Sequence, residues 1–233
     1  GPEAVTASLQ LLSADLDRGL ALLADVLLRP AFEERKLALA KAALQESLRR
    51  RNDNPRSIPS RELARALYGE AHPLGWELTP ARVEAVTRDD LRAWHAALLD
   101  PARAFVAATG DFEAGALLAA LQREFGGWRG PSPPLPPVAS PPAPRRAVIL
   151  VEKAVAQSSI VLGHFGRRRG DPDQPAAELM NFILGGGGLT SRIAARVRTA
   201  EGLAYGAGTL LAFGGQDPGW FRAYADTKPA TTR

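Results

Sequence analysis

The sequence contains no cysteine among its 233 residues. This absence excludes disulfide bonds, cysteine-ligated zinc, iron–sulfur clusters and thiol catalysis from the chain. No run of 18 or more apolar residues occurs, so we expect no membrane span. The opening GPEAVTASLQLL has no basic region followed by an apolar one, and no signal peptide is expected there. The compartment stays open between periplasm and cytoplasm.

Several catalytic motifs are also missing. The three histidines, His72, His95 and His164, are far apart, and neither HxxEH nor HxH occurs. We therefore expect no cofactor and no zinc site built within this segment. His72, which precedes a proline, is expected to be a hydrogen-bonding loop residue. GxSxG is absent as well, which excludes a hydrolase nucleophile elbow.

Basic residues slightly outnumber acidic ones, giving a formal net charge of +4 and an isoelectric point near 9.8. The basic runs, such as 49–51 and 167–169, are short. They do not alternate with aromatic residues as a base-stacking surface does. We therefore expect a solvated arginine-rich surface and no nucleic-acid partner.

A proline-rich segment divides the chain. Eight of the 14 residues in 131–144 are proline, which excludes a helix or a central strand. We expect an extended linker over 131–145, between one unit at 1–130 and another at 146–233. Runs of helices and strands on either side predict an α+β fold with antiparallel sheets covered on one side by helices.

The expected elements follow from periodicity and caps. Helical spacing predicts helices over 16–28, 33–50, 60–68, 114–125 and 175–184, and Thr79 and Thr87 are expected to cap two more. A short helix is expected at 191–200. Strands are expected near residues 3–12, 104–109, 147–152 and 158–164, and a hairpin of two strands over 202–227.

Four consecutive glycines occupy 185–188. A phosphate loop would need a strand before them and a lysine after them, and this sequence has neither. A glycine ending the preceding helix, with Thr190 or Ser191 capping the next, accounts for one or two of the four. The others indicate a backbone that something approaches closely.

A resemblance covers nearly the whole chain. The segments RPAFEERKLALAKAALQESLRRRNDNP, LYGEAHPLGW, VTRDDLRAWH, ATGDF and GGGGLTSRIAARVRTAEGLAYG occur in that order. They resemble the insulinase/pitrilysin-type zinc metallopeptidases, which include the mitochondrial processing peptidases. The resemblance implies two homologous α+β halves that close around a peptide. In that family the first half carries HxxEH and a later glutamate for zinc, and the second carries an arginine and a tyrosine seven residues apart.

The resemblance assigns roles to particular residues. It implies that Arg198 and Tyr205 act on the peptide and the tetrahedral intermediate, and that Gly186, Gly187 and Gly188 lie beside the bound peptide. Glu46 corresponds to the later zinc glutamate, if HxxEH is present elsewhere. A tyrosine hydroxyl and a guanidinium both donate hydrogen bonds to a developing oxyanion, which fits these roles.

The absent HxxEH leaves alternatives open. The motif and its zinc belong either upstream, in a longer active metalloendopeptidase, or to a partner. Leu39, at a position where active members have an acidic residue, and the run RRRNDNP favour a zinc-less member. Such a chain is expected to bind peptide and to pair with a zinc-bearing homologous subunit, or with itself as a homodimer. A third alternative is a purely structural, peptide-holding subunit.

Overall fold

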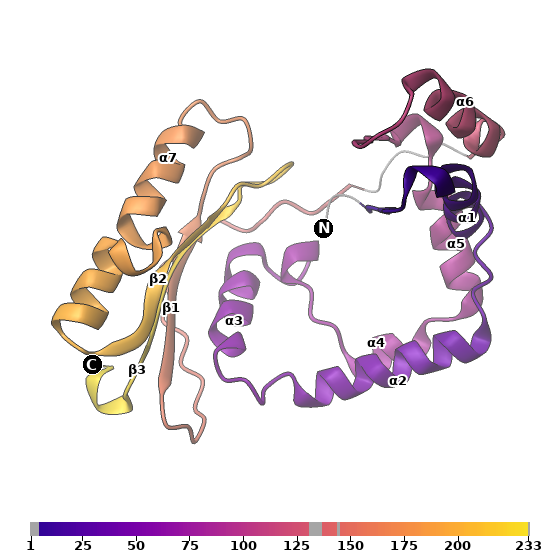
Figure 1. Cartoon of the computed structure of the whole chain (residues 1–233). Helices are drawn as coiled ribbons and strands as arrows, with labels where there is room; N and C mark the ends of the chain where they lie inside the picture. The colour runs from indigo at the N-terminus through magenta and orange to yellow at the C-terminus, as the bar shows by residue number, and fades with distance from the viewer. Residues whose placement is uncertain (1–4, 131–136, 144, 233) are drawn as a thin grey trace. The chain divides into compact units, whose positions relative to one another are not determined.

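The computed structural model describes residues 5–130, 137–143 and 145–232. Contacts between residues divide this part of the chain into two compact units. The unit with the β-sheet, called here the sheet unit, contains residues 47–78 and 137–232. The helical unit contains residues 5–46 and 79–130. Figure 1 shows helices together with an antiparallel sheet, so the α+β prediction is confirmed.

The helical unit contains α1 (Leu16–Leu28), most of α2 (Glu34–Arg50), α4 (Pro80–Ala85), α5 (Arg88–Leu98) and α6 (Ala114–Phe125). The predicted caps are confirmed. The Thr79 hydroxyl accepts from the Arg82 amide, and Thr87 forms a capping box with Asp90. These hydrogen bonds from the Thr87 hydroxyl and amide lower the pKa of the Asp90 carboxyl. The starts of α4 and α5 are therefore fixed by local hydrogen bonds.

The sheet has the order β1–β3–β2, with every pairing antiparallel. Its strands are β1 (Ser158–Phe165), β2 (Ala204–Ala212) and β3 (Trp220–Thr227). The predicted hairpin of β2 and β3 is confirmed, as is the strand expected over 158–164. β3 pairs with β2 on one side and with β1 on the other, so β1 and β2 are the edge strands of the described sheet.

Helices cover both faces of this sheet, and not one face as expected, as Figure 1 shows for α3 (Ser57–Tyr68) and α7 (Gln174–Asn181). Leu63 of α3 lies against Gly163, which pairs with Arg222 of β3. The π-helix η4 (Phe182–Gly186) continues α7 and lies against Thr209 of β2. Thr209 pairs with Ala223, the residue that follows Arg222 in β3. Because successive side chains of a strand point to opposite faces, the two contacts are on opposite sides.

Three predicted strands are wrong. Residues 5–12, 104–109 and 147–152 form no strand in the described part of the chain. Phe105 is 98% exposed, and Val148 and Leu150 are 88% and 86% exposed. Their apolar, β-favouring composition misled the prediction, because a strand also needs a neighbouring backbone to pair with its N–H and C=O groups.

Two predicted helices have a different geometry from the expected one. The helix expected over 175–184 is α7 followed by the π-helix η4, and the helix expected over 191–200 contains the π-helix η6 (Ala194–Ala200). The first wide turn contains Gly185 and Gly186 of the glycine run, and the second begins after the run, at Ala194. Periodicity alone does not distinguish a π-turn from an α-turn, and π-turns are frequent at functional sites.

The predicted segments 1–130, 131–145 and 146–233 stay a prediction, because residues 131–136 and 144 lie outside the described part of the chain. The structure adds one fact that composition did not predict. Residues 47–78, which precede the proline-rich segment, are packed with the sheet that follows it. No helix in the described ranges is long and apolar enough to cross a membrane.

The end of α3 is joined to the loop between β2 and β3 by Tyr68 and His72. The Tyr68 hydroxyl donates to the Pro218 carbonyl at 3.0 Å, and its ring stacks on His72. The His72 Nδ1 accepts from the Leu74 amide, so Nε2 donates to Asp217 at 3.0 Å. The expected loop role of His72 is confirmed, and its partner comes from 145 residues away.

Burial, and secondarily the charge of Asp217, raise the pKa of Tyr68. The folded protein therefore keeps the Tyr68 proton at a pH where the unfolded chain has lost it. This contribution to stability is complete below the unfolded pKa of about 10 and is lost as the pH rises through the folded pKa.

We expect Tyr68→Phe to lower the unfolding free energy by about 1 kcal/mol near neutral pH. The unfolding free energy of this variant should also fall less steeply with pH above pH ~10 than that of the parent. Urea unfolding across this pH range measures both effects. Tyr205→Phe, which removes the hydroxyl of an exposed tyrosine, is the control. Equal alkaline slopes in Tyr68→Phe and the parent would contradict the prediction.

Candidate functional site

Arg198 and Tyr205 lie together in the structure. Arg198 belongs to the π-helix η6, and Tyr205 is the second residue of β2. The guanidinium carbon of Arg198 is 4.8 Å from the centre of the Tyr205 ring, which is a cation–π contact. Tyr205 is 74% exposed and Arg198 is half-buried, so both donors face solvent in part. Their predicted role on a peptide stays a prediction.

The turn between them is held by its own backbone. Gly202 has a φ of +62°, a left-handed conformation that favours glycine. The Leu203 amide donates to the Val197 carbonyl at 2.9 Å, and the Leu203 carbonyl accepts from the Thr227 hydroxyl at 2.8 Å. The turn is thereby attached to the end of β3, and it fixes where β2 begins.

A β-bulge sets the direction of Tyr205. Ala204 pairs with Thr227 and Ala207 pairs with Ala225, so Tyr205 and Gly206 together oppose a single residue of β3. A bulge of this kind redirects side chains, and bulges are frequent beside active sites. Gly206, the other bulged residue, brings the chain close to that opposing residue, Asp226.

Asp226 is a buried carboxylate beneath the bulge. Its Oδ1 accepts from the Ser159 hydroxyl at 2.7 Å, and its Oδ2 lies 3.0 Å from the Nε of Arg56. Sequence reasoning did not find this cluster, because its three members match no motif: Arg56 precedes α3, Ser159 belongs to β1 and Asp226 belongs to β3. The cluster joins β1 and the residue before α3 to the residue of β3 that lies opposite the bulge.

The four glycines of the run have separate reasons to be glycine. A Cβ on Gly185 would lie 2.4 Å from the Thr209 nitrogen, and one on Gly186 would lie 2.6 Å from the Asn181 side chain. A Cβ on Gly187 would lie 2.7 Å from a helix carbonyl, whereas Gly188 faces open space but has a φ of +66°. Close approach and one left-handed residue explain the run within the molecule. The predicted peptide contact of Gly186, Gly187 and Gly188 stays a prediction.

The residues after the run are held by their own hydroxyls. The Thr190 hydroxyl donates to the Gly187 carbonyl at 3.0 Å, and the Ser191 hydroxyl donates to the Gly188 carbonyl at 2.7 Å. Ser191 also accepts from the Ala194 amide at 3.4 Å, so it is the capping residue that the sequence left open. The loop that leads to Arg198 is therefore ordered by side chain–backbone hydrogen bonds.

The donor groups that zinc requires are not gathered in this structure. In residues 5–130, 137–143 and 145–232, no group of three or more His, Asp, Glu or Cys side chains could hold a metal ion. One nitrogen of each histidine already has a partner: His95 contacts the Leu27 carbonyl, His164 contacts the Phe165 carbonyl and His72 contacts Asp217. Because zinc needs three or more protein ligands, Glu46 by itself does not fit a zinc site. Its assignment stays a prediction about a site completed by other residues.

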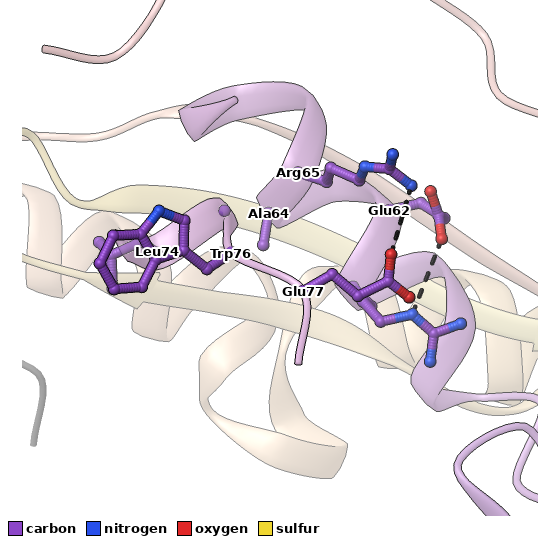
Figure 2. Close-up of a pocket in the computed structure, with 8 residues that line it drawn as sticks. Glu62, Ala64, Arg65, Leu74, Trp76 and Glu77 are labelled. Carbon is purple, nitrogen blue, oxygen red and sulfur yellow. Dashed lines mark ion pairs between the residues drawn. The ribbon is translucent and has the colours of Figure 1, made fainter. Parts of the chain in front are cut away.

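A second candidate site is a small pocket between α3 and the loop after it. Figure 2 shows Leu74 and Trp76 on one side of it and Glu62, Arg65 and Glu77 on the other. Its volume is about 50 Å³, far below the roughly 300 Å³ of a small-molecule site. Arg65 pairs with Glu70 and lies 3.8 Å from Glu77, so its charge is already compensated. This pocket does not suit a peptide.

Comparison with known proteins identifies the family. Residues 85–233 match the family described as the peptidase M16 inactive domain. An uncharacterised zinc protease from Streptomyces coelicolor is 28% identical over 95% of this chain and 49% of its own length. Another from Mycobacterium tuberculosis is 30% identical over 83% of this chain and 45% of its own length. The chain thus spans about half the length of the curated relatives it matches.

Solved structures agree with the sequence relatives. A peptidase M16 inactive domain from Pseudomonas fluorescens superposes with a TM-score of 0.83 and 28% identity, over 93% of this chain and 52% of that one. A protease from Helicobacter pylori, at 20% identity and a TM-score of 0.82, shares the fold over 93% of this chain and 53% of that one. The resemblance to zinc metallopeptidases found in the sequence is therefore confirmed. The chain belongs to the peptidase M16 inactive-domain family.

Proposed function

We propose that this chain is a non-catalytic, peptide-binding part of a zinc peptidase assembly, in which Arg198 and Tyr205 contact a peptide bound at a zinc site held by a homologous subunit. The observation that carries the proposal is the placement of the pair. A π-helix, a left-handed glycine and a β-bulge together bring two hydrogen-bond donors to one exposed spot. Local distortions of this kind are concentrated at functional sites.

The chemistry of the pair suits a peptide carbonyl. The Arg198 guanidinium carries several donors in a fixed plane, and the Tyr205 hydroxyl supplies one more. Donors held in place before the reaction stabilise negative charge as it develops on a carbonyl oxygen. The zinc relatives' names and the absence of a metal-binding group in the described residues support a division of labour between two subunits.

The first test is activity of the chain by itself. We expect the purified protein, stripped of metal and resupplied with zinc, to leave an unstructured fluorogenic peptide uncleaved at any zinc concentration. A mixture with a homologous HxxEH subunit from the same organism should cleave it, and that subunit with its glutamate base replaced is the control. Zinc-dependent cleavage by the chain alone would overturn the proposal and favour an active enzyme.

A structural role is the second candidate function, and one observation favours it. Arg198 and Tyr205 contact each other, so the pair also stabilises the turn between η6 and β2. In this alternative the chain holds the assembly or the peptide without assisting the reaction. Replacing only the tyrosine hydroxyl, which leaves the ring contact intact, separates the two functions.

A further inference from the structure

A buried threonine at the end of β3 holds the turn between η6 and β2. Thr227 is 6% exposed, and its backbone pairs with Ser158 of β1 on one side and Ala204 of β2 on the other. Its hydroxyl donates to the Leu203 carbonyl at 2.8 Å, and the Thr231 hydroxyl lies 2.6 Å from the same oxygen. Because the central strand fixes where this hydroxyl lies, the turn is attached to a well-defined point of the sheet.

Leu203 connects this attachment to both members of the Arg198–Tyr205 pair. The Leu203 amide donates to the Val197 carbonyl at 2.9 Å, and Val197 directly precedes Arg198 in η6. Tyr205 follows Leu203 by two residues. The same residue is thus bonded to η6 through its amide and to β3 through its carbonyl, so a displacement of Leu203 moves both donors relative to the sheet.

The β-bulge makes the direction of Tyr205 depend on the backbone around it. The register of β2 with β3 passes from the pair Ala204–Thr227 directly to the pair Ala207–Ala225, so Tyr205 lies between two fixed points. Tyr205 is 74% exposed, so packing of its side chain constrains it little. The hydrogen bond from Thr227 to the residue before Ala204 reinforces the first of the two fixed points.

We propose that Thr227 is a positioning residue for the Arg198–Tyr205 pair. The inference rests on the proposed function, because it concerns how the two donors are aimed at a peptide carbonyl. Donors stabilise a developing charge when they are held in place before the reaction, and a misplacement of about 1 Å can cost about 100-fold in rate. Thr227 is buried beneath the turn, so it acts through the pair and not on the peptide.

The direction of the Tyr205 ring can be measured without any partner subunit. The chain has three tyrosines, so protein labelled with 3-fluorotyrosine gives three fluorine NMR signals, which are assigned by replacing one tyrosine at a time with phenylalanine. Thr227→Val replaces the hydroxyl with a methyl group of similar size. We expect it to shift or broaden the Tyr205 signal and to leave the Tyr68 signal in place, which shows that the fold is kept. Thr227→Ser, which keeps the hydroxyl, should restore the parent signal. An unchanged Tyr205 signal in Thr227→Val would overturn the proposal.

Kinetics of the peptidase reconstituted with a zinc-bearing homologue test whether this position matters for the reaction. Thr227→Val should lower kcat about tenfold and change KM less than about twofold, because the donors act on the transition state. Thr227→Ser should keep the parent kcat. Thr209→Val is the matched control, since Thr209 is a buried threonine of the same sheet whose hydroxyl donates to the Asn181 carbonyl instead of the turn. It should leave kcat unchanged, and an equal fall of kcat in Thr209→Val and Thr227→Val would contradict a positioning role.

The two measurements separate this inference from the proposed function. An assembly whose kcat does not respond to Tyr205→Phe would overturn the proposed function, whereas the fluorine signal would still show whether Thr227 directs the ring. An assembly that responds to Tyr205→Phe and not to Thr227→Val would overturn the positioning role alone.

Discussion

Tyr205→Phe should lower the kcat of the peptidase reconstituted with a zinc-bearing homologue by about 100-fold while leaving the stability of this chain unchanged. The substitution removes one hydroxyl donor and keeps the ring that Arg198 contacts at 4.8 Å. Loss of a single donor to a developing oxyanion costs roughly 100- to 1,000-fold in kcat. Steady-state hydrolysis of a fluorogenic peptide, together with thermal unfolding, measures the two quantities separately.

Arg198→Ala should reduce kcat by a similar factor and should also destabilise the turn slightly. An exposed cation–π contact contributes about 0.5–1 kcal/mol, which is a small change in the unfolding free energy. Arg196→Ala is the matched control, because Arg196 lies in the same π-helix and pairs with Glu201 at 2.8 Å. An unchanged kcat in both Tyr205→Phe and Arg198→Ala would identify the chain as a structural subunit.

Gly185→Ala should destabilise the protein by about 3 kcal/mol, because this glycine is the point where η4 touches the sheet. Its Cβ would lie 2.4 Å from the Thr209 nitrogen and 2.8 Å from the Gly208 carbonyl carbon, both of which are backbone atoms. Neither atom can move without displacing β2, so the added methyl group separates helix and strand. The hydrogen bond from the Thr209 hydroxyl to the Asn181 carbonyl, 3.3 Å long, should weaken at the same time.

Gly188→Ala is the comparison within the same run. A Cβ at this position meets open space, and only the φ of +66° opposes it, at a cost of about 1 kcal/mol. Urea unfolding of the two variants should therefore show losses that differ about threefold. Equal losses would indicate that the run acts through chain flexibility and would refute the packing explanation for Gly185.

Local signals predicted the parts of the fold that local interactions create. The caps at Thr79 and Thr87, the helix Ala114–Phe125 and the hairpin strands were all predicted correctly, because each depends on hydrogen bonds or periodicity within a few residues. The strands expected at 104–109 and 147–152 were wrong for the opposite reason. Composition indicates that a segment can be a strand, but pairing decides whether it becomes one.

The candidate site divides in the same way. The motif predicted the family and identified Arg198 and Tyr205 by their spacing. The structure places the two side chains in contact. The β-bulge at Tyr205 was not readable, because it depends on the register with β3. Nor was the buried Asp226, whose partners Arg56 and Ser159 stand 170 and 67 residues away in the sequence.

By itself the sequence determined the family, the caps at Thr79 and Thr87, the absence of cysteine chemistry and the residues of the pair. Only the tertiary structure decided that α3 packs on the sheet through Tyr68 and His72, and that the glycine run is a set of close contacts. The physical reason is the distance along the sequence over which each kind of interaction acts. Propensity, capping and spacing act over one or two helical turns, whereas register, close approach and buried charge pairs exist only after distant segments have met.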